Sequence, residues 1–392
     1  MNLREKALEL HERNKGKIEI KLKTEINNKA DLSLAYTPGV AEPCKEIEKD
    51  SENVYKYTNK GNLVAIVTDG TAVLGLGDIG PLAGYPVMEG KAALFKAFAD
   101  VDAIPICLDT TDVDEIVETI KNIAPTFGGI NLEDIASPRC FEIERRLIED
   151  LDIPIFHDDQ HGTAIIVLAA LINALKVAKK DMSEIKVVIN GIGAAGSAIA
   201  KILLAVGVKK IHLVQRHGIV YPGDNTNNFL QEELAQIVNP DGVKGSLTDA
   251  LSGADVFIGV SKGNLVTSEM VSKMNEKAIV FAMANPVPEI YPDEALAGGA
   301  MVVGTGRSDF PNQINNVSVF PGIFKGALKA RARKISEQMK ITAAYAIANV
   351  IDSNDLTPEY IIADVFNKDV VKAVAKAVED EAYKSNLAKK DN

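Results

Sequence analysis

Three glycines, Gly191, Gly193 and Gly196, form the pattern GxGxxG directly after an apolar run at residues 187–189. An amphipathic helical pattern follows, and a strand-like run at Lys210–Val214 stands at the spacing of a βαβ unit. In this context the glycines allow a tight turn, backbone approach to a pyrophosphate, and close packing of helix on strand. The stretch predicts a dinucleotide site rather than a structural turn, formed by Gly191, Gly193, Ala194, Ala195 and Gly196.

The residue at the end of the second strand of this unit helps to determine whether NAD or NADP binds. NAD sites usually have an acidic residue there, which binds the adenosine ribose hydroxyls. This chain has Gln215 followed by Arg216. A neutral side chain removes the repulsion of a 2′-phosphate, and Arg216 could pair with that phosphate, although it could equally be a solvated loop residue or stack on adenine. The residues favour NADP slightly over NAD.

Two acidic pairs, Glu133-Asp134 and Asp158-Asp159, each follow a predicted strand. Ligands gather at the carboxyl ends of parallel strands, so the two pairs are expected to converge. Converging carboxylates repel one another, and a divalent cation offsets the repulsion; oxygen ligands favour Mg²⁺ or Mn²⁺ over zinc. Asp134 and Asp159 also precede helical runs and could instead be helix N-caps, and spacing alone does not separate the two interpretations.

Four further side chains stand where chemistry could occur. Lys91 lies at the predicted start of a helix in an apolar sequence, where loss of solvation could lower its pKa; the alternative is a surface lysine. Tyr36 lies in a proline-rich loop expected at Asp31–Cys44, and a tyrosine there is more often structural than catalytic. Asn285 and Asn316 each sit where a strand ends and could meet nicotinamide or substrate.

These residues need a scaffold that brings strand ends together. Strand and helix patterns alternate between residues 63 and 156, which predicts a parallel sheet with helices on both faces. The strands are expected at Leu63–Thr68, Ala103–Leu108, Gly129–Leu132 and Ile153–Phe156, and the helices at Ala92–Ala99, Val113–Asn122 and Arg139–Glu149. The loop Gly75–Gly80 lacks a following helical pattern and is interpreted as close backbone packing beside a substrate.

A long apolar helix from Gln160 to Ala178 connects this region to the dinucleotide unit, beyond which the alternation continues. We expect helices at Asn227–Ile237 and Leu247–Leu251, and strands at Asp255–Gly259, Ala278–Ala282 and Met301–Gly304. The sequence thus predicts an α/β protein of three parts. They are a substrate and metal domain (1–160), a Rossmann-type dinucleotide-binding domain (161–318) and a C-terminal helical segment (319–392).

Composition limits the function classes. The 392 residues carry a net charge of −11 with no basic stripe, which argues against a nucleic-acid partner. The charged N-terminal residues do not resemble a signal peptide, and no apolar run is judged long enough to span a membrane. Three widely spaced cysteines fit neither a disulfide framework nor a thiolate metal site. We expect a cytoplasmic protein without a membrane partner.

A series of segments along nearly the whole chain resembles the small bacterial and archaeal type of malic enzyme. They read SLAYTPGVAEPC, GLGDIGPLAGYPVMEGKAALFKAFA, GGINLEDI, IPIFHDDQHGTA, VINGIGAAG, ANPVPEI and NNVSVFPGIFKGAL. The resemblance implies oxidative decarboxylation of L-malate to pyruvate and CO₂ with NAD or NADP and Mg²⁺ or Mn²⁺. It also implies a homodimer or a dimer-based assembly.

The same resemblance implies roles for individual residues. Tyr36 is similar to the general acid of the family, and Lys91 to its general base. The implied metal ligands are Glu133, Asp134 and Asp159, with Asp158 orienting Lys91 or a ligand. The implied substrate contacts are Asn285, Asn315 and Asn316, of which Asn285 also resembles a nicotinamide contact.

Two departures from the family pattern bear on the function. Larger members carry an arginine for a malate carboxylate before the GLGD segment, where this chain has Thr-Ala-Val-Leu at residues 71–74, and Gln215 leaves the coenzyme open.

Two rival functions are weighed against the resemblance. A redox-only 2-hydroxy acid dehydrogenase would use His157 and Asp158 as a relay without a metal. A nucleotide-sensing protein would keep the fold and lack the chemistry.

Overall fold

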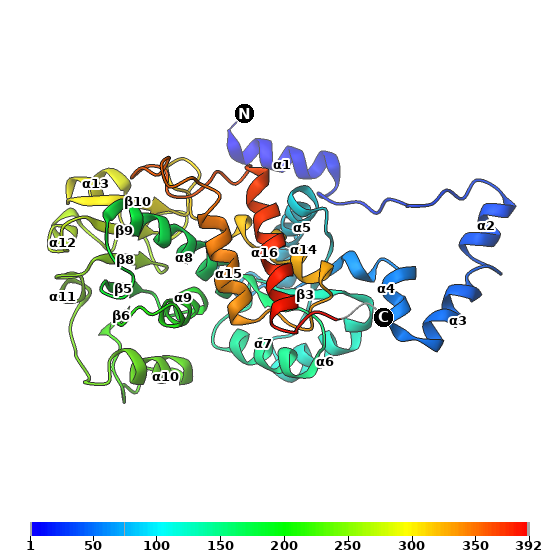
Figure 1. Cartoon of the computed structure of the whole chain (residues 1–392), viewed down its shortest axis with the longest axis horizontal. Coiled ribbons are helices and arrows are strands. Elements are labelled where there is room, and N and C mark those ends of the chain that lie inside the picture. Colours follow the sequence, from blue (N-terminus) through cyan, green and yellow to red (C-terminus); the bar gives the residue numbers. More distant parts are fainter. Residues whose placement is uncertain (1, 74, 390–392) are drawn as a thin grey trace.

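Two mainly parallel sheets, each flanked by helices, form the body of the protein (Figure 1). The computed structural model describes residues 2–73 and 75–389. Leu74, the last residue of the segment that stands in place of the family's arginine, lies outside the described residues. The predicted α/β fold class is confirmed, while the predicted domain limits at residues 160 and 318 stay a prediction.

The first sheet has four parallel strands in the order β2-β1-β3-β4. The strands are β1 (Leu63–Thr68), β2 (Asp102–Cys107), β3 (Gly129–Leu132) and β4 (Ile155–His157). All residues of β1, β3 and β4 are buried, as expected for strands covered on both faces. Helices α6 (Val113–Ile123) and α7 (Arg139–Asp150) share one apolar core with this sheet, and α5 (Gly80–Ala99) packs into the other.

The second sheet has the order β10-β9-β8-β5-β6-β7, with β7 antiparallel to β6. Its strands are β5 (Lys186–Asn190), β6 (Lys210–Gln215), β7 (Gly218–Ile219), β8 (Val256–Gly259), β9 (Ala278–Ala282) and β10 (Ala300–Thr305). This is the strand order of a doubly wound dinucleotide fold in which the short β7 takes the place of the third parallel strand. The helices of this half are α9 (Ala194–Ala205), α10 (Phe229–Val238), α11 (Leu247–Leu251), α12 (Ser268–Val271) and α13 (Pro292–Ala297).

Helix α8 (Asp158–Ala178) connects the two halves and packs against α9 and against α15 (Glu337–Ala348). The prediction that no apolar run could span a membrane is wrong by length and composition, because α8 has 21 residues and a mean hydropathy of 1.7. Its apolar window is 78% buried inside the protein. A helix that is apolar on all sides and buried to this extent is a core helix.

The C-terminal helices close the core over the first sheet. Helix α14 (Phe320–Lys329) packs against α5 and α16 (Lys368–Lys384), and α15 packs against α16 (Figure 1). Aromatic rings meet where these elements converge: Phe320 and Phe324 lie 4.8 and 5.3 Å from Phe95, centroid to centroid. One continuous apolar core therefore joins the first sheet, α8, the dinucleotide fold and the C-terminal helices.

The N-terminal region differs from the prediction around Tyr36. It consists of α1 (Leu3–Asn14), α2 (Lys29–Ala35), α3 (Ala41–Lys49), the 3₁₀ turns at Ser51–Asn53 and Lys60–Asn62, and α4 (Val54–Tyr57). The loop expected at residues 31–44 is instead mostly two helices with a tight turn between them. The side chain of Asn28 caps α2 by accepting hydrogen bonds from the amides of Ala30 and Asp31. This N-cap is a local signal for a helix, and the prediction of a loop from the prolines did not take it into account.

Helix α5 also differs from the prediction. It begins at Gly80 rather than at Ala92, so the Gly75–Gly80 loop does lead into a helix, and Lys91 lies inside that helix. Pro81 in the first turn is compatible with a helix start, and Pro86 lies within the helix. The glycines and prolines of this stretch hid the helical pattern, because these residues ordinarily mark turns.

Candidate active site

The three predicted metal ligands lie together at the carboxyl ends of β3 and β4. Glu133 and Asp134 follow β3, and Asp159 stands in the first turn of α8, directly after β4. One oxygen from each carboxylate lies within 4.8 Å of the other two. The alternative that Asp134 and Asp159 are N-caps is wrong, because α7 begins only at Arg139 and α8 already begins at Asp158.

Burial makes this cluster suited to a cation. Burial, reinforced by the negative charges of Asp159 and Glu133, raises the pKa of Asp134 to about 9. Burial also raises the pKa of Glu133 and of Asp159. Oδ2 of Asp134 is buried and has no hydrogen-bond partner among the described residues. Three mutually repelling oxygen donors with an unsatisfied buried atom fit Mg²⁺ or Mn²⁺.

Lys91 approaches this cluster from α5. Its Nζ lies 2.9 Å from Oε1 of Glu133, contacts Oδ2 of Asp158 and sits 4.0 Å from the centre of the Phe320 ring. The side chain is only 7% exposed, so the surface-lysine alternative is wrong. Burial disfavours the charged amine, but the attraction of Asp158 and Glu133 outweighs burial and raises the pKa of Lys91. The lowering expected from burial is absent here because two carboxylates contact the amine.

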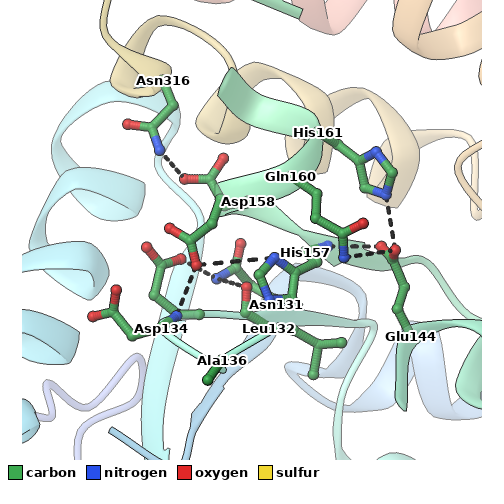
Figure 2. A network of polar contacts seen from close by, with 12 residues as sticks. Asn131, Leu132, Asp134, Ala136, Glu144, His157, Asp158, Gln160, His161 and Asn316 are labelled. Atoms are coloured by element: carbon green, nitrogen blue, oxygen red, sulfur yellow. Dashed lines mark hydrogen bonds and ion pairs between the residues drawn. The ribbon is translucent and has the colours of Figure 1, made fainter. Parts of the chain in front are cut away.

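Asp158 is fully buried between Lys91 and Asn316. The Nδ2 of Asn316 donates a hydrogen bond of 2.6 Å to Oδ2 of Asp158 (Figure 2). Gly162, one turn further along α8, leaves the space for this carboxylate, since a Cβ at that position would lie 1.9 Å from Oδ1 of Asp158. Asp158 is thus held in one position in contact with the amine of Lys91.

Glu144 of α7 secures the start of α8 (Figure 2). Its Oε1 accepts from the amide of His157 at 2.9 Å, and its Oε2 lies 2.9 Å from Nε2 of His161 and 3.3 Å from Nε2 of Gln160. Burial opposes ionisation of Glu144, but the charges of His161 and Lys340 outweigh it and lower its pKa to about 2. This ionised side chain fixes the helix turn that carries Asp158 and Asp159.

Of the three glycines of the dinucleotide pattern, Gly191 and Gly193 lie in the turn between β5 and α9, and Gly196 lies in the first turn of α9. Gly191 has a φ of +104°, which side chains rarely allow. A Cβ on Gly196 would lie 1.8 Å from the carbonyl oxygen of Gly191, so only glycine permits this close packing. At Gly193 no atom lies within 4 Å of the Cβ position, which leaves open space at the N-terminus of α9. This space suits a pyrophosphate.

A cavity of about 580 Å³ lies between the two halves of the molecule. Asp159 lines it from the first half, and Gly193, Ala194 and Ala195 line it from the dinucleotide turn. The three predicted amide side chains also reach it, namely Asn285, Asn315 and Asn316. A larger cavity of about 660 Å³ beside Glu144 contains none of the predicted site residues.

Comparison with known proteins agrees with this arrangement. Residues 15–148 match the family description "Malic enzyme, N-terminal domain", and residues 160–383 match "Malic enzyme, NAD binding domain". The chain belongs to the malic enzyme family. It is 58% identical to the "Bifunctional malic/malolactic enzyme" of Bacillus subtilis (strain 168), over 99% of this chain and 95% of that protein. It is also 58% identical to the "NAD-dependent malic enzyme" of Geobacillus stearothermophilus, over 96% and 79% of the two chains.

A solved malic enzyme confirms the family assignment at the level of structure. The crystal structure of malic enzyme from Pyrococcus horikoshii Ot3 superimposes with a TM-score of 0.96 and 50% identity, over 100% of this chain and 93% of that chain. The predicted enzyme class, an oxidoreductase of the malic enzyme type that uses a nicotinamide coenzyme, is confirmed by these matches. The assignment of roles to single residues stays a prediction.

One residue implied by the malic enzyme resemblance is missing from the site. Tyr36 follows α2 with 66% of its surface exposed, and neither α2 nor α3 lies beside the sheets that carry the cavity (Figure 1). The structure of a single chain therefore does not bring Tyr36 to Lys91 and the carboxylates. The residues expected at the adenosine end of the coenzyme lie at the predicted place, the end of β6. Gln215 is the last residue of β6 and its Nε2 donates a hydrogen bond of 3.3 Å to Thr226, and Arg216 beside it is exposed.

Several residues that shape the malic enzyme site were not predicted from sequence. They are Asn131, which donates to Oε2 of Glu133 at 2.9 Å, and also Gly162, Glu144 and Phe320. A polar residue inside the apolar strand β3 was a usable signal for Asn131. The other three act through contacts between distant segments, which local patterns do not encode.

Proposed function

We propose that the cavity between the two sheets is where L-malate is oxidised and decarboxylated to pyruvate and CO₂. The observation that carries this proposal is a convergence: Asp159 and Asn316 line the same cavity as Gly193 and Ala194 of the dinucleotide turn. A small acid in this cavity meets the carboxylate cluster on one side and the coenzyme on the other. Both halves of the reaction can therefore take place on one bound molecule.

Glu133, Asp134 and Asp159 are the residues that would hold Mg²⁺ or Mn²⁺. A bound cation would polarise the C2 oxygen of malate and stabilise the charge left by departing CO₂, and the nicotinamide of NAD or NADP would accept the hydride. The protein's part is to bring three carboxylates together at the ends of β3 and β4, of which Asp159 lines the cavity. Asn131 holds Glu133, and the amide of Asp134 holds Oδ2 of Asp159 at 2.9 Å.

Lys91 would take the proton of the C2 hydroxyl. It must be neutral to act as a base, and its two carboxylate contacts favour the charged form. Glu133 is one of the three carboxylates that would hold the cation, and offsetting its charge would remove one of the two interactions that keep Lys91 protonated. Asp158 stays in contact and positions the amine against the face of Phe320.

The asparagines offer amide donors where larger family members use an arginine. Asn316 is oriented by its hydrogen bond to Asp158, and the Oδ1 of Asn315 accepts from the amide of Val317 at 2.9 Å, which leaves its NH₂ group for a carboxylate of malate. Asn285 lines the cavity near the dinucleotide turn and suits the nicotinamide or the second carboxylate. Arg139 is engaged elsewhere, with its Nη2 3.0 Å from both Asp69 and Thr71.

The remaining assignments rest on the resemblance. Tyr36 would protonate C3 of the enol of pyruvate, and Gln215 with Arg216 would contact the adenosine end of NADP or NAD. We propose a homodimer or dimer-based assembly in the cytoplasm. The rival redox-only dehydrogenase finds no support in the pair His157 and Asp158, because the carboxylate of Asp158 contacts Lys91 and Asn316.

The test of this function is the yield of pyruvate per reduced coenzyme. Purified protein is given L-malate and Mn²⁺, separately with NAD and with NADP, and both products are assayed in the same tube. We expect equal amounts of pyruvate and reduced coenzyme, and none of either after chelation of the cation. Reduced coenzyme without pyruvate would support the redox-only dehydrogenase, and coenzyme binding without reduction would support a nucleotide sensor.

A further inference from the structure

Glu289 is a buried carboxylate that takes no part in the reaction as proposed so far. It is 0% exposed and follows β9 in the segment ANPVPEI. Burial raises its pKa, and among the residues that the structure describes no lysine, arginine or histidine forms an ion pair with it. Burying a carboxylate without a cation costs stability unless other donors satisfy its oxygens. The groups that donate to Glu289 therefore indicate what it does.

The two oxygens of Glu289 accept hydrogen bonds from the backbone amides of two different loops. Oε1 accepts from the amide of Ser261 at 2.9 Å, in the loop after β8. Oε2 accepts from the amide of Ala284 at 3.0 Å, in the loop after β9. Each donor lies two residues beyond the end of its strand. One carboxylate therefore ties two neighbouring strand ends together.

The surrounding backbone holds this carboxylate in one position. A Cβ on Gly259, the last residue of β8, would lie 2.4 Å from the carboxyl carbon of Glu289, so the glycine leaves the space that the carboxylate fills. The carbonyl oxygen of Glu289 accepts from the amides of Leu265 and Val266, both at 3.0 Å. Main chain and side chain of Glu289 are thus both fixed.

The loops that Glu289 joins form the coenzyme side of the active-site cavity. Ser261 lines the cavity from the loop after β8, and Ala284 and Asn285 line it from the loop after β9. The end of β5 joins the same network, because Nδ2 of Asn190 donates a hydrogen bond of 2.8 Å to Oγ of Ser261. The strand order reverses between β5 and β8, and dinucleotide folds bind their coenzyme at this point of the sheet.

We propose that Glu289 is a positioning residue for hydride transfer, which holds Ser261 and Asn285 where they meet the nicotinamide half of NAD or NADP. This inference rests on the proposed function. In that step the C2–H bond of malate breaks and its two electrons pass with the hydrogen to the nicotinamide ring, while the hydroxyl proton leaves and C2 becomes a carbonyl. Glu289 acts through the two loops and transfers no proton itself.

Decarboxylation should not depend on Glu289. The carboxylate cluster stands on the first sheet, at the ends of β3 and β4, whereas Glu289 holds two strand ends of the second sheet. Release of CO₂ from oxaloacetate breaks the C3–C4 bond, leaves its electrons on the enolate and moves no hydride. It needs the cluster but no oriented nicotinamide. A change at Glu289 is therefore expected to separate the two activities.

The test measures both activities in Glu289→Gln. The variant keeps the size of the side chain, but its NH₂ group faces one of the two backbone amides, so one loop loses its acceptor. We expect kcat for coenzyme reduction with L-malate to fall by about 10²-fold. CO₂ release from added oxaloacetate with Mn²⁺ should keep the wild-type rate. Deuterium at C2 of malate should slow the variant by a larger factor than the wild-type protein, because hydride transfer then limits the rate.

Glu294→Gln is the matched control, since Glu294 is exposed on α13 and should keep both activities. Gly259→Ala displaces the same carboxylate without removing its charge and should reproduce the separation, so it carries the test if Glu289→Gln does not fold. Equal loss of both activities in a folded variant, an unchanged isotope effect, or wild-type coenzyme reduction would each overturn the inference. Wild-type protein that makes no pyruvate from malate would instead contradict the proposed function, so the two failures are distinct.

Discussion

Gly162 is the residue on which the position of Asp158, and through it Lys91, depends most directly. A methyl group at Gly162 would fall 1.9 Å from Oδ1 of Asp158 and would displace that carboxylate. Gly162→Ala should therefore lower kcat by about 10²-fold, a usual cost of misplacing a catalytic group by an ångström. Binding of NAD or NADP, measured by fluorescence, should not change.

A matched control for Gly162→Ala exists on the helix that carries Lys91. Gly90 is helical, and no atom lies within 4 Å of its Cβ position, so Gly90→Ala should keep the wild-type rate. If Gly162→Ala were as active as Gly90→Ala, the rate of the reaction would not depend on the observed position of the Asp158 carboxylate.

Asp134 would link the proposed cation binding to pH. Its pKa of about 9 in the folded protein is far above the value of about 4 in an unfolded chain. Without a cation, this group's contribution to stability is fully present below about pH 4 and is lost as the pH rises toward about 9. A bound cation replaces the proton, so Mn²⁺ should raise the melting temperature more at pH 8 than at pH 6, measured by scanning calorimetry.

Asp134→Asn is the control for this linkage. The amide cannot ionise, so the difference between pH 6 and pH 8 should shrink in the variant. A larger Mn²⁺ effect at pH 6 than at pH 8 in the wild-type protein would contradict a buried carboxylate site.

At the scale of elements, α7 supports the start of α8 through Glu144. The pKa of Glu144 is lowered to about 2, so its contribution to stability is present above the unfolded pKa of about 4 and is lost as the pH falls through about 2. Glu144→Gln should cost on the order of 3 kcal/mol at pH 7. Urea unfolding at pH 7 and pH 3 should show the cost shrinking at the lower pH.

Glu142→Gln is the comparison for Glu144→Gln on the same helix. Glu142 is exposed and lies 3.6 Å from Arg146, so its loss should change stability by less than about 0.5 kcal/mol. Equal effects of the two variants would show that Glu144 does not hold α8.

We expect the end of β6 to determine the choice between NAD and NADP. Gln215→Asp would place a negative charge where the 2′-phosphate of NADP is expected, and like charges brought together repel strongly. We expect kcat/KM with NADP to fall by about tenfold or more, equivalent to about 1.4 kcal/mol, and the value with NAD to change little. A variant with an unchanged ratio of the two coenzymes would mean that Gln215 does not contact the adenosine ribose.

At the scale of the whole molecule, local patterns predicted most of the two sheets. Strands β3 and β9 can be recognised from their own apolar sequence without knowledge of distant contacts, and both were predicted with their observed bounds. The helix predicted from sequence was shorter than α5, because Gly84, Pro86 and Gly90 are residue types that ordinarily mark turns. Its true length depends on packing against the first sheet and α14, which no local pattern contains.

Only the site residues that lie at strand ends or in family motifs could be predicted from the sequence. The convergence of Glu133, Asp134 and Asp159 follows from parallel topology. The contact between Lys91 and Asp158 joins residues 67 positions apart and reverses the expected shift in the pKa of Lys91. The exposure of Tyr36 could not be predicted, because a motif names a residue without fixing how the helices on either side of it pack.

The central claim is that one cluster, Glu133, Asp134 and Asp159, serves both hydride loss and decarboxylation. The direct measurement compares the wild-type protein with Asp159→Asn in two reactions: coenzyme reduction with L-malate, and CO₂ release from added oxaloacetate, both with Mn²⁺. We predict that the variant loses both activities by about 10²-fold or more while it still binds NAD or NADP. Wild-type rates in either reaction would contradict a single shared cluster.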